Sequence, residues 1–165
     1  MQPDVHWHAS TTSAAEALAD HVRLLRGPGV VSSGRLCPSC GSSAHGRPWL
    51  RHEDGPLHVS LSRSGPHLVT VIAGDPVGVD VEVEEVDVDP ALVMAPGETG
   101  DVARTWARKE AVLKLRGTGL ATAMSEVVLA DETWRDLPAP EGYVAAVATG
   151  GIAPPARQPV PRSGP

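Results

Sequence analysis

Apolar and polar residues alternate in the middle of the chain, and this pattern predicts β-strands. Residues 57–61 and 68–73 are rich in Val, Leu and Ile, and residues 77–83 read Val-Gly-Val-Asp-Val-Glu-Val. Short segments containing Gly and Pro, at 64–66 and 74–76, separate these runs as turns do. We therefore expect three consecutive strands in this part of the chain.

Two further segments have the spacing of helices. Ser13 and Glu16 have the spacing of a capping box, which predicts that an Ala- and Leu-rich helix begins here and continues to about Leu25. The Gly-Pro-Gly sequence at 27–29 ends it. A second helix is expected at 101–116.

The order of these elements predicts an α+β fold. After the second helix, residues 126–130 and 143–148 are expected to form a closing hairpin around a proline-rich loop. One helix followed by three strands, then one helix followed by two, suggests two pseudo-symmetric halves at about 13–76 and 77–152. Each half is expected to be a long helix packed on a small antiparallel sheet.

The composition agrees with one domain that has an aliphatic core. The chain has 165 residues and a mass of 17.2 kDa, within the usual size of a single domain. It has no Phe and one Tyr, so Trp49, Trp106 and Trp134 are expected to be the large core residues. Residues 1–12 are expected to form a flexible N-terminus, and the proline-rich residues 153–165 a disordered tail.

The net charge of −6 argues against nucleic-acid binding, which depends on a basic surface. Eight acids and no Lys or Arg lie between residues 77 and 103. No apolar run is long enough to span a membrane and no signal peptide is recognisable, so a cytoplasmic protein without membrane contact is expected. The chain has only two lysines, Lys109 and Lys114, and both lie in the second predicted helix.

Three carboxylates can meet beside these lysines. Asp80 and Glu82 share one face of their strand, and Trp106, Glu110 and Lys114 follow one another at i, i+4 on the helix. Mg²⁺ prefers carboxylate oxygens and is often completed by substrate phosphates, which a lysine can contact as a point charge. Spacing alone also fits an ordinary polar strand face and a helical ion pair. Both interpretations stay open on these grounds.

The residues themselves favour the metal site. Residues 77–82 and 106–114, in this order, closely resemble the two signature motifs of the 4'-phosphopantetheinyl transferases, specifically the Sfp type. On this resemblance, residues 13–152 form a phosphopantetheinyl transferase domain. The resemblance covers roughly residues 13–148 and includes Cys-Pro-Ser-Cys-Gly at 37–41, His-Gly-Arg-Pro at 45–48, Val-Ser-Leu-Ser-Arg-Ser-Gly at 59–65 and Gly-Thr-Gly-Leu at 117–120.

The resemblance implies an activity. Enzymes of this family transfer the phosphopantetheine arm of coenzyme A to a serine of an apo acyl or peptidyl carrier protein and release 3',5'-ADP. By motif position, Asp80, Glu82 and Glu110 would bind Mg²⁺, and Lys109 and Lys114 would contact the pyrophosphate. Lys114 would stabilise the leaving phosphate, and either Glu110 or a metal-bound water would accept the proton of the serine.

The resemblance also implies where coenzyme A binds. The loop with Arg47 and Pro48 would lie against the adenine, and Ser62 and Arg63 would contact phosphates. The protein would act as a monomer, with its site between the two halves. Carrier proteins are typically acidic, so the docking surface is expected among the basic residues after the acidic segment, with three candidates: Arg104, Arg108 and Arg116.

Three departures from the family pattern support an alternative. Arg63 stands where the family usually has His, the N-terminal segment is shorter than usual, and only the residues 83–105 separate Glu82 from Trp106. Arginine can bind phosphate but does not deprotonate. The alternative function is a non-catalytic module that binds coenzyme A or a carrier protein.

Cys37, Cys40 and His45 suggest a separate zinc site. A closed structural zinc site has four ligands, and only His52 or His58 is near enough in sequence to complete it. The other interpretation is a reduced thiol pair in a surface turn. A small zinc-binding interaction domain is therefore a third, weaker hypothesis for the function.

Overall fold

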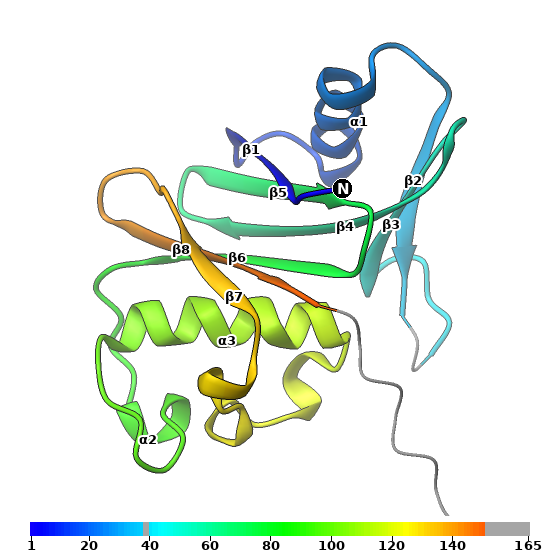
Figure 1. The fold of residues 1–165 in the computed structure, drawn as a ribbon. Helices are drawn as coiled ribbons and strands as arrows, with labels where there is room; N and C mark the ends of the chain where they lie inside the picture. Colours follow the sequence, from blue (N-terminus) through cyan, green and yellow to red (C-terminus); the bar gives the residue numbers. More distant parts are fainter. Residues whose placement is uncertain (38–39, 151–165) are drawn as a thin grey trace, which may run out of the picture.

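The computed structural model describes residues 1–37 and 40–150, and it has an α+β fold with two antiparallel sheets (Figure 1). The expected tail at 153–165 lies outside the described residues. The first sheet has the order β1-β5-β4-β3-β2, with strands Asp4–Ala9 (β1), Val31–Leu36 (β2), Arg47–His52 (β3), Gly55–Ser64 (β4) and His67–Ala73 (β5). The second has the order β6-β8-β7, with strands Val77–Val83 (β6), Trp134–Leu137 (β7) and Tyr143–Thr149 (β8).

The helices lie on opposite sides of the strands in Figure 1, with α1 beside the first sheet and α3 beside the second. No helix among the described residues is long and apolar enough to cross a membrane. The helical elements are Ala14–Arg26 (α1), Pro90–Val93 (α2), Val102–Arg116 (α3) and three 3₁₀ turns at Gly119–Ala121 (η1), Met124–Glu126 (η2) and Leu129–Asp131 (η3).

Both long helices begin where the sequence predicts. The Ser13 hydroxyl accepts from the Glu16 N–H at 3.2 Å, and the Ser13 N–H donates to the Glu16 carboxylate at 3.0 Å, which completes the capping box of α1. Asp101 caps α3 by accepting from the Arg104 N–H at 2.7 Å. Gly117 ends α3 with a φ of +73°, a conformation that favours glycine.

The strands predicted at 57–61, 68–73, 77–83 and 143–148 are confirmed as parts of β4, β5, β6 and β8. The strand predicted at 126–130 is wrong. That segment forms η2 and η3, and the third strand of the second sheet is β7 instead. Val127 is buried in the core cluster of α3, and the chain on either side of it turns through local hydrogen bonds, from the Val127 N–H to the Met124 carbonyl at 3.0 Å and from the Asp131 N–H to the Val128 carbonyl at 3.1 Å.

The flexible N-terminus predicted at 1–12 is also wrong in its central part. Strand β1 pairs antiparallel with β5 along its whole length, from Asp4 opposite Ile72 to Ala9 opposite His67. Its two histidines, His6 and His8, alternate with Val5, Trp7 and Ala9, so the strand pattern is present in the sequence but spans only six residues. The His8 ring hydrogen bonds the Thr70 hydroxyl at 2.9 Å. Strands β2 and β3 were not predicted either, since they contain Gly, Pro, Ser and Arg without clear alternation.

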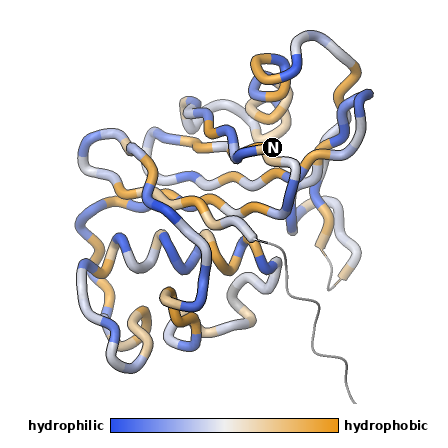
Figure 2. Tube along the Cα trace, viewed as in Figure 1, coloured by the Kyte–Doolittle hydropathy of each residue, from blue (hydrophilic) through white to orange (hydrophobic). Residues whose placement is uncertain are grey.

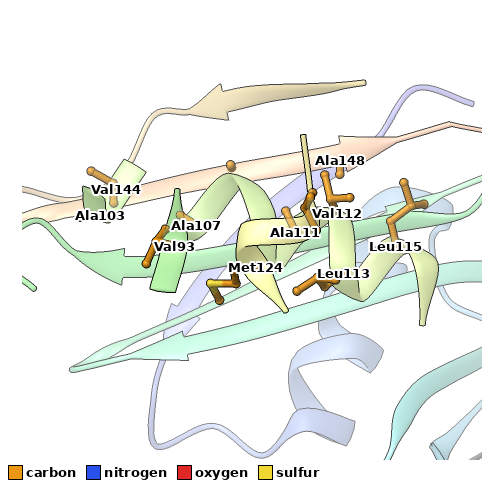
Figure 3. Packing of buried hydrophobic residues seen from close by; sticks show 12 residues of the cluster. Val93, Ala103, Ala107, Ala111, Val112, Leu113, Leu115, Met124, Val144 and Ala148 are labelled. Carbon is orange, nitrogen blue, oxygen red and sulfur yellow. The ribbon is translucent and has the colours of Figure 1, made fainter. Parts of the chain in front are cut away.

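The core is aliphatic, as predicted. Figure 2 shows apolar residues along the central strands, and Figure 3 shows the side chains of α3 clustered with Val144 and Ala148 of β8 and with Met124. Trp106 and Trp134 pack against this cluster, but Trp49 is 42% exposed and is not a core residue, because alternation along β3 turns Leu50 into the core and Trp49 to the other face.

Helix α3 packs directly on β6. The apolar stripe Ala107, Ala111 and Leu115 is buried against the sheet. The backbone of the helix comes so close that a Cβ atom on Gly78 would lie 2.0 Å from the Ala111 carbonyl oxygen. Glycine at 78 therefore sets how closely the helix approaches the strand that carries Asp80.

The two sheets meet where β4 lies against β6. The Ser60 hydroxyl of β4 accepts from the Val79 N–H of β6 at 3.2 Å. This contact places the buried side of β4 next to Asp80, on the strand against which α3 packs.

Candidate functional site

One residue from each of β4, β6 and α3 meets at this point. The Lys114 ammonium donates to the Ser62 hydroxyl at 2.9 Å and to Asp80 Oδ1 at 2.5 Å. The Ser62 hydroxyl donates to the same carboxylate oxygen at 2.7 Å. Three of the predicted site residues are thus in direct contact, although they lie far apart in the sequence.

Asp80 is the buried centre of this group, with 2% of its surface exposed. Burial raises the pKa of its carboxyl, while Lys114 and Ser62 act in the opposite direction. Its second oxygen, Oδ2, is also buried and accepts no hydrogen bond from any described residue. A buried carboxylate oxygen without a partner is costly, so this atom is one that a bound cation would satisfy.

Glu82 and Glu110 surround Asp80 with further negative charge. Burial, together with the charges of Asp80 and Glu110, raises the pKa of Glu82 from 4.5 to about 7, against the opposing effects of Lys114 and a hydrogen bond from Trp106. Burial and the charge of Asp80 also raise the pKa of Glu110. Repulsion between the three carboxylates is therefore only partly relieved by the single lysine.

These donors fit Mg²⁺ in chemistry. All three supply hard carboxylate oxygens, Asp80 has a buried oxygen with no described partner, and all three have raised pKa values that a cation would lower. Their oxygen atoms lie farther apart than the ligand atoms of a closed metal site. In the part of the chain that the structure describes, only Cys37, Cys40 and His45 form a group with all ligand atoms within 4.8 Å of one another. Binding of one ion by all three carboxylates would require them to approach.

Lys114 also lies at the edge of a pocket of about 340 Å³ that Arg47 and Pro48 line. The predicted adenine loop and the predicted phosphate lysine therefore share one cavity. Three cations and no acid are found among the described lining residues, which are Arg35, Cys37, Gly46, Arg47, Pro48, Val59, Ser60, Leu61, Lys114, Gly117, Thr118 and Gly119.

Arg35 is a pocket residue that the sequence analysis did not identify. Its guanidinium donates to the Gly46 carbonyl at 3.2 Å, and its backbone lies opposite Pro48 in the β2–β3 hairpin. The sequence carries little signal for it, because its place depends on the pairing of two strands that have no alternating pattern.

Lys109, which was predicted to contact the pyrophosphate, is not among the residues that line this pocket. It is fully buried on another side of α3, where its ammonium donates to the Val93 carbonyl at 2.8 Å, to the Met124 carbonyl at 3.2 Å and to the Glu98 carboxylate. Five residues separate it from Lys114, which rotates its direction by about 140° around a helix with 3.6 residues per turn. Lys109 thus connects α3 to the segments around α2 and η2.

Arg63 is also placed differently from the prediction. Alternation along β4 turns Ser62 inward and Arg63 outward. Its exposed guanidinium donates to the carbonyls of Ser10 at 3.2 Å and Thr12 at 2.6 Å. It holds the loop that leads into α1 and does not face Lys114.

The three arginines predicted to receive a carrier protein are all engaged with acids. Arg108 makes two hydrogen bonds to Asp136, at 2.8 and 2.6 Å, and lies 4.4 Å above the Trp134 ring. Arg104 is 3.5 Å from Glu84, and Arg116 pairs with Glu132. Their positive charge is thus largely neutralised within the chain.

Comparison with known proteins adds no identification. A scan against models of protein families finds no match to this chain, and a search of curated proteins finds no match either.

Proposed function

We propose that this protein transfers the 4'-phosphopantetheine arm of coenzyme A to a serine of an apo acyl or peptidyl carrier protein, with Mg²⁺, and releases 3',5'-ADP. The observation that carries the proposal is the buried Asp80 carboxylate. It has one oxygen bonded to Lys114 and Ser62 and the other without a described partner, next to two carboxylates with raised pKa values. Such a site suits a divalent cation beside a phosphate-bearing substrate.

The neighbouring pocket supports coenzyme A as that substrate. Coenzyme A carries a pyrophosphate and a 3'-phosphate, so its binding site needs cations and few acids. Arg35, Arg47 and Lys114 supply three cations, and no described residue of the pocket supplies an acid. Arginine can bind a phosphate with two parallel hydrogen bonds, while lysine contacts it as a movable charge.

The proposed reaction is an attack of the carrier serine oxygen on the β-phosphorus of coenzyme A. A new P–O bond forms to the serine, and the bond to the leaving 3',5'-ADP breaks. Bound Mg²⁺ would supply charge neutralisation at the pyrophosphate. Lys114, which is 28% exposed at its side chain, can turn from Asp80 toward a phosphate oxygen and stabilise the leaving group.

Glu110 is proposed to accept the proton of the serine. Glu110 lies one helical turn before Lys114, so it would face the same side of the site as the leaving phosphate. Ser62 keeps its hydrogen bond to Asp80 and so holds that carboxylate in place while Lys114 moves.

We also propose that the chain consists of two related halves. In the first sheet, β1 precedes the helix and pairs with β5, and β5 also pairs with β4, which gives the order β1-β5-β4. The second sheet repeats this order as β6-β8-β7, again with the long helix following the first strand. The shared order supports a first half that includes β1.

The alternative, a non-catalytic module that binds coenzyme A or a carrier protein, is supported by a specific observation. Two residues that the family motif would place on coenzyme A phosphates, Lys109 and Arg63, are engaged in contacts within the chain. Fewer contacts to the substrate would leave binding possible and transfer weak.

The test is to incubate the protein with Mg²⁺, coenzyme A and an apo carrier protein, and to measure the intact mass of the carrier. We expect a phosphopantetheine adduct on the carrier and its loss in Asp80→Ala. The matched control is Asp131→Ala, which removes an exposed aspartate from η3 and should retain activity.

The outcomes separate the two functions. If several apo carriers gain no adduct while calorimetry detects binding of coenzyme A, the non-catalytic module replaces the transferase. Full activity of Asp80→Ala would show that the metal assignment is wrong.

A further inference from the structure

The second candidate site lies at the turn between β2 and β3 and is separate from the carboxylate group around Asp80. Ligand atoms of Cys37, Cys40 and His45 all lie within 4.8 Å of one another. The Cys40 sulfur is 3.4 Å from His45 Nε2. Cys40 and His45 are exposed, so the group is open to solvent and to ions.

The backbone holds the three residues in this arrangement. The Gly41 N–H donates to the Cys37 carbonyl at 2.8 Å, and the Cys37 N–H donates to the Ser42 carbonyl at 2.9 Å. Gly41 has a φ of +72°, which favours glycine. These bonds hold Cys37 next to Gly41 and Ser42, and the two cysteine sulfurs lie within 4.8 Å of each other.

His45 is held against this turn by the residue that follows it. Gly46 has a φ of +103°, and a Cβ atom there would lie 2.5 Å from the Cys37 nitrogen and 2.4 Å from the Leu36 carbonyl oxygen. Only glycine permits this approach of the two backbone segments. The backbone at His45 is therefore held close to that of Cys37, which keeps the exposed imidazole near the cysteine pair.

We propose that Cys37, Cys40 and His45 bind one Zn²⁺ ion. Thiolates and imidazole are the ligands that zinc prefers, and the Cys-x-x-Cys spacing is typical of structural zinc sites. Zn–S bonds of about 2.3 Å and Zn–N bonds of about 2.0–2.1 Å at a tetrahedral angle place sulfur and nitrogen about 3.5 Å apart. The Cys40–His45 distance of 3.4 Å agrees with this separation.

The bound form balances in charge and protons. Two thiols lose their protons to solvent and the neutral imidazole supplies its lone pair, so the ion and its three ligands together are neutral. Among the described residues, no other His, Cys, Asp or Glu joins the group, so the fourth position would hold water or an external ligand.

Neither histidine that the sequence suggested as a fourth ligand is in place. His52 pairs with Val31 at one end of the β2–β3 hairpin, while Cys37 follows Leu36 at the other end. His58 lies on β4, opposite Ala73 of β5. The structure therefore assigns a three-residue site with one exchangeable position.

The site also borders the cationic pocket. Cys37 and Gly46 line that pocket together with Arg47 and Pro48. A metal at this turn would cross-link the two segments on which that wall is built and reduce their motion. The zinc site does not depend on the transferase function, since that proposal gives none of the three ligands a role in binding Mg²⁺ or in the transfer.

The test is the metal content of the full chain, purified with a reductant and without chelator. We expect elemental mass spectrometry to find about one zinc per chain, as for a single tetrahedral site. Cys37→Ser, Cys40→Ser and His45→Gln should each lower the zinc content to roughly one tenth or less, because each removes a ligand. The matched control is His58→Gln, an exposed histidine outside the group, which should keep its zinc.

A second measurement covers variants that fail to fold. Cobalt added to the reduced, metal-free wild-type chain should produce thiolate-to-cobalt absorption, and zinc should abolish it. The proposal is overturned if the wild-type chain holds no zinc and gives no such absorption. It is also overturned if the folded variants keep their zinc, or if the reduced chain proves by mass spectrometry to retain a Cys37–Cys40 disulfide.

Discussion

Substitution of Gly78 by alanine tests how α3 is held on the strand that carries the site. A Cβ atom at this position would lie 2.0 Å from the Ala111 carbonyl oxygen and 2.5 Å from the Leu115 nitrogen, whereas ordinary contact begins at 3.4 Å. Both atoms belong to the helix backbone and cannot rotate away. The helix must therefore move from β6 by about 1 Å or more, a displacement of the kind that overpacking forces.

The energetic cost follows from this displacement. Overpacking of a close-packed core costs about 1–3 kcal/mol, and a clash with backbone belongs at the upper end. Replacing glycine by alanine in a strand also stabilises the folded protein by about 0.5–1 kcal/mol, because alanine restricts the conformations of the unfolded chain. The net loss of about 2 kcal/mol corresponds to a fall in Tm of about 4–8 °C for a domain of this size.

Thermal and urea unfolding, followed by circular dichroism, measure this loss. The matched control is Gly34→Ala in β2, whose Cβ atom would approach the Trp49 ring to 2.8 Å. That ring is part of a side chain that is 42% exposed and can turn aside, so the control should change Tm by less than about 2 °C. Equal Tm values for Gly78→Ala and the control would refute the close packing of α3 on β6.

The same substitution should affect the proposed reaction. Glu110 and Lys114 move with α3, while Asp80 stays on β6, so their relative geometry changes. A misplacement of about 1 Å can cost about 100-fold in rate. The transfer rate of the folded Gly78→Ala protein should therefore fall by about that factor, and an unchanged rate would contradict the proposed site.

Three further predictions concern charged side chains. The pKa of Glu82 is raised from 4.5 to about 7, so the stability that its protonated form contributes to the metal-free protein should be present below pH 4.5 and lost as the pH rises through about 7. Glu82→Gln should flatten this fall in thermal melts across the pH range, and an identical pH profile would contradict it. Lys109→Ala should lower the free energy of unfolding by about 3 kcal/mol, because it removes the only cation paired with Glu98 among the described residues, and should leave the affinity for coenzyme A nearly unchanged. A loss of affinity for coenzyme A in a Lys109→Ala protein of normal stability would instead support a contact between Lys109 and phosphate. Lys114→Ala should weaken coenzyme A binding in calorimetry about tenfold, as expected from one lost charged hydrogen bond of about 1.5 kcal/mol, and an unaltered affinity would exclude a role in binding.

The sequence was most informative where a pattern is local. The capping box at Ser13 and Glu16 and the alternation of residues 77–83 predicted their elements well, because hydrogen bonding and side-chain direction there depend only on near neighbours. The i, i+4 spacing of Trp106, Glu110 and Lys114 likewise placed one face of α3 toward Asp80.

The sequence was least informative where the position of a side chain depends on contacts with segments distant in the sequence. Strand β1 alternates apolar and polar residues over only six positions, and its place in the sheet depends on pairing with β5, which lies far away in the sequence. Lys109 was predicted to contact phosphate because its motif contains it, but the chain folds α2 and η2 over that side of the helix and buries it. Neither fact is visible before the tertiary contacts are known.

The sequence by itself thus determined the α+β elements, the shared faces of Asp80 with Glu82 and of Glu110 with Lys114, and the presence of a cysteine pair near a histidine. Only the tertiary structure decided that Lys114 reaches Asp80, that Lys109 does not, and that His45 closes on the cysteines. The reason is physical: periodicity sets the direction of a side chain from its own backbone. Its partner is set by how closely separate elements pack, as the glycine at 78 allows for α3 on β6.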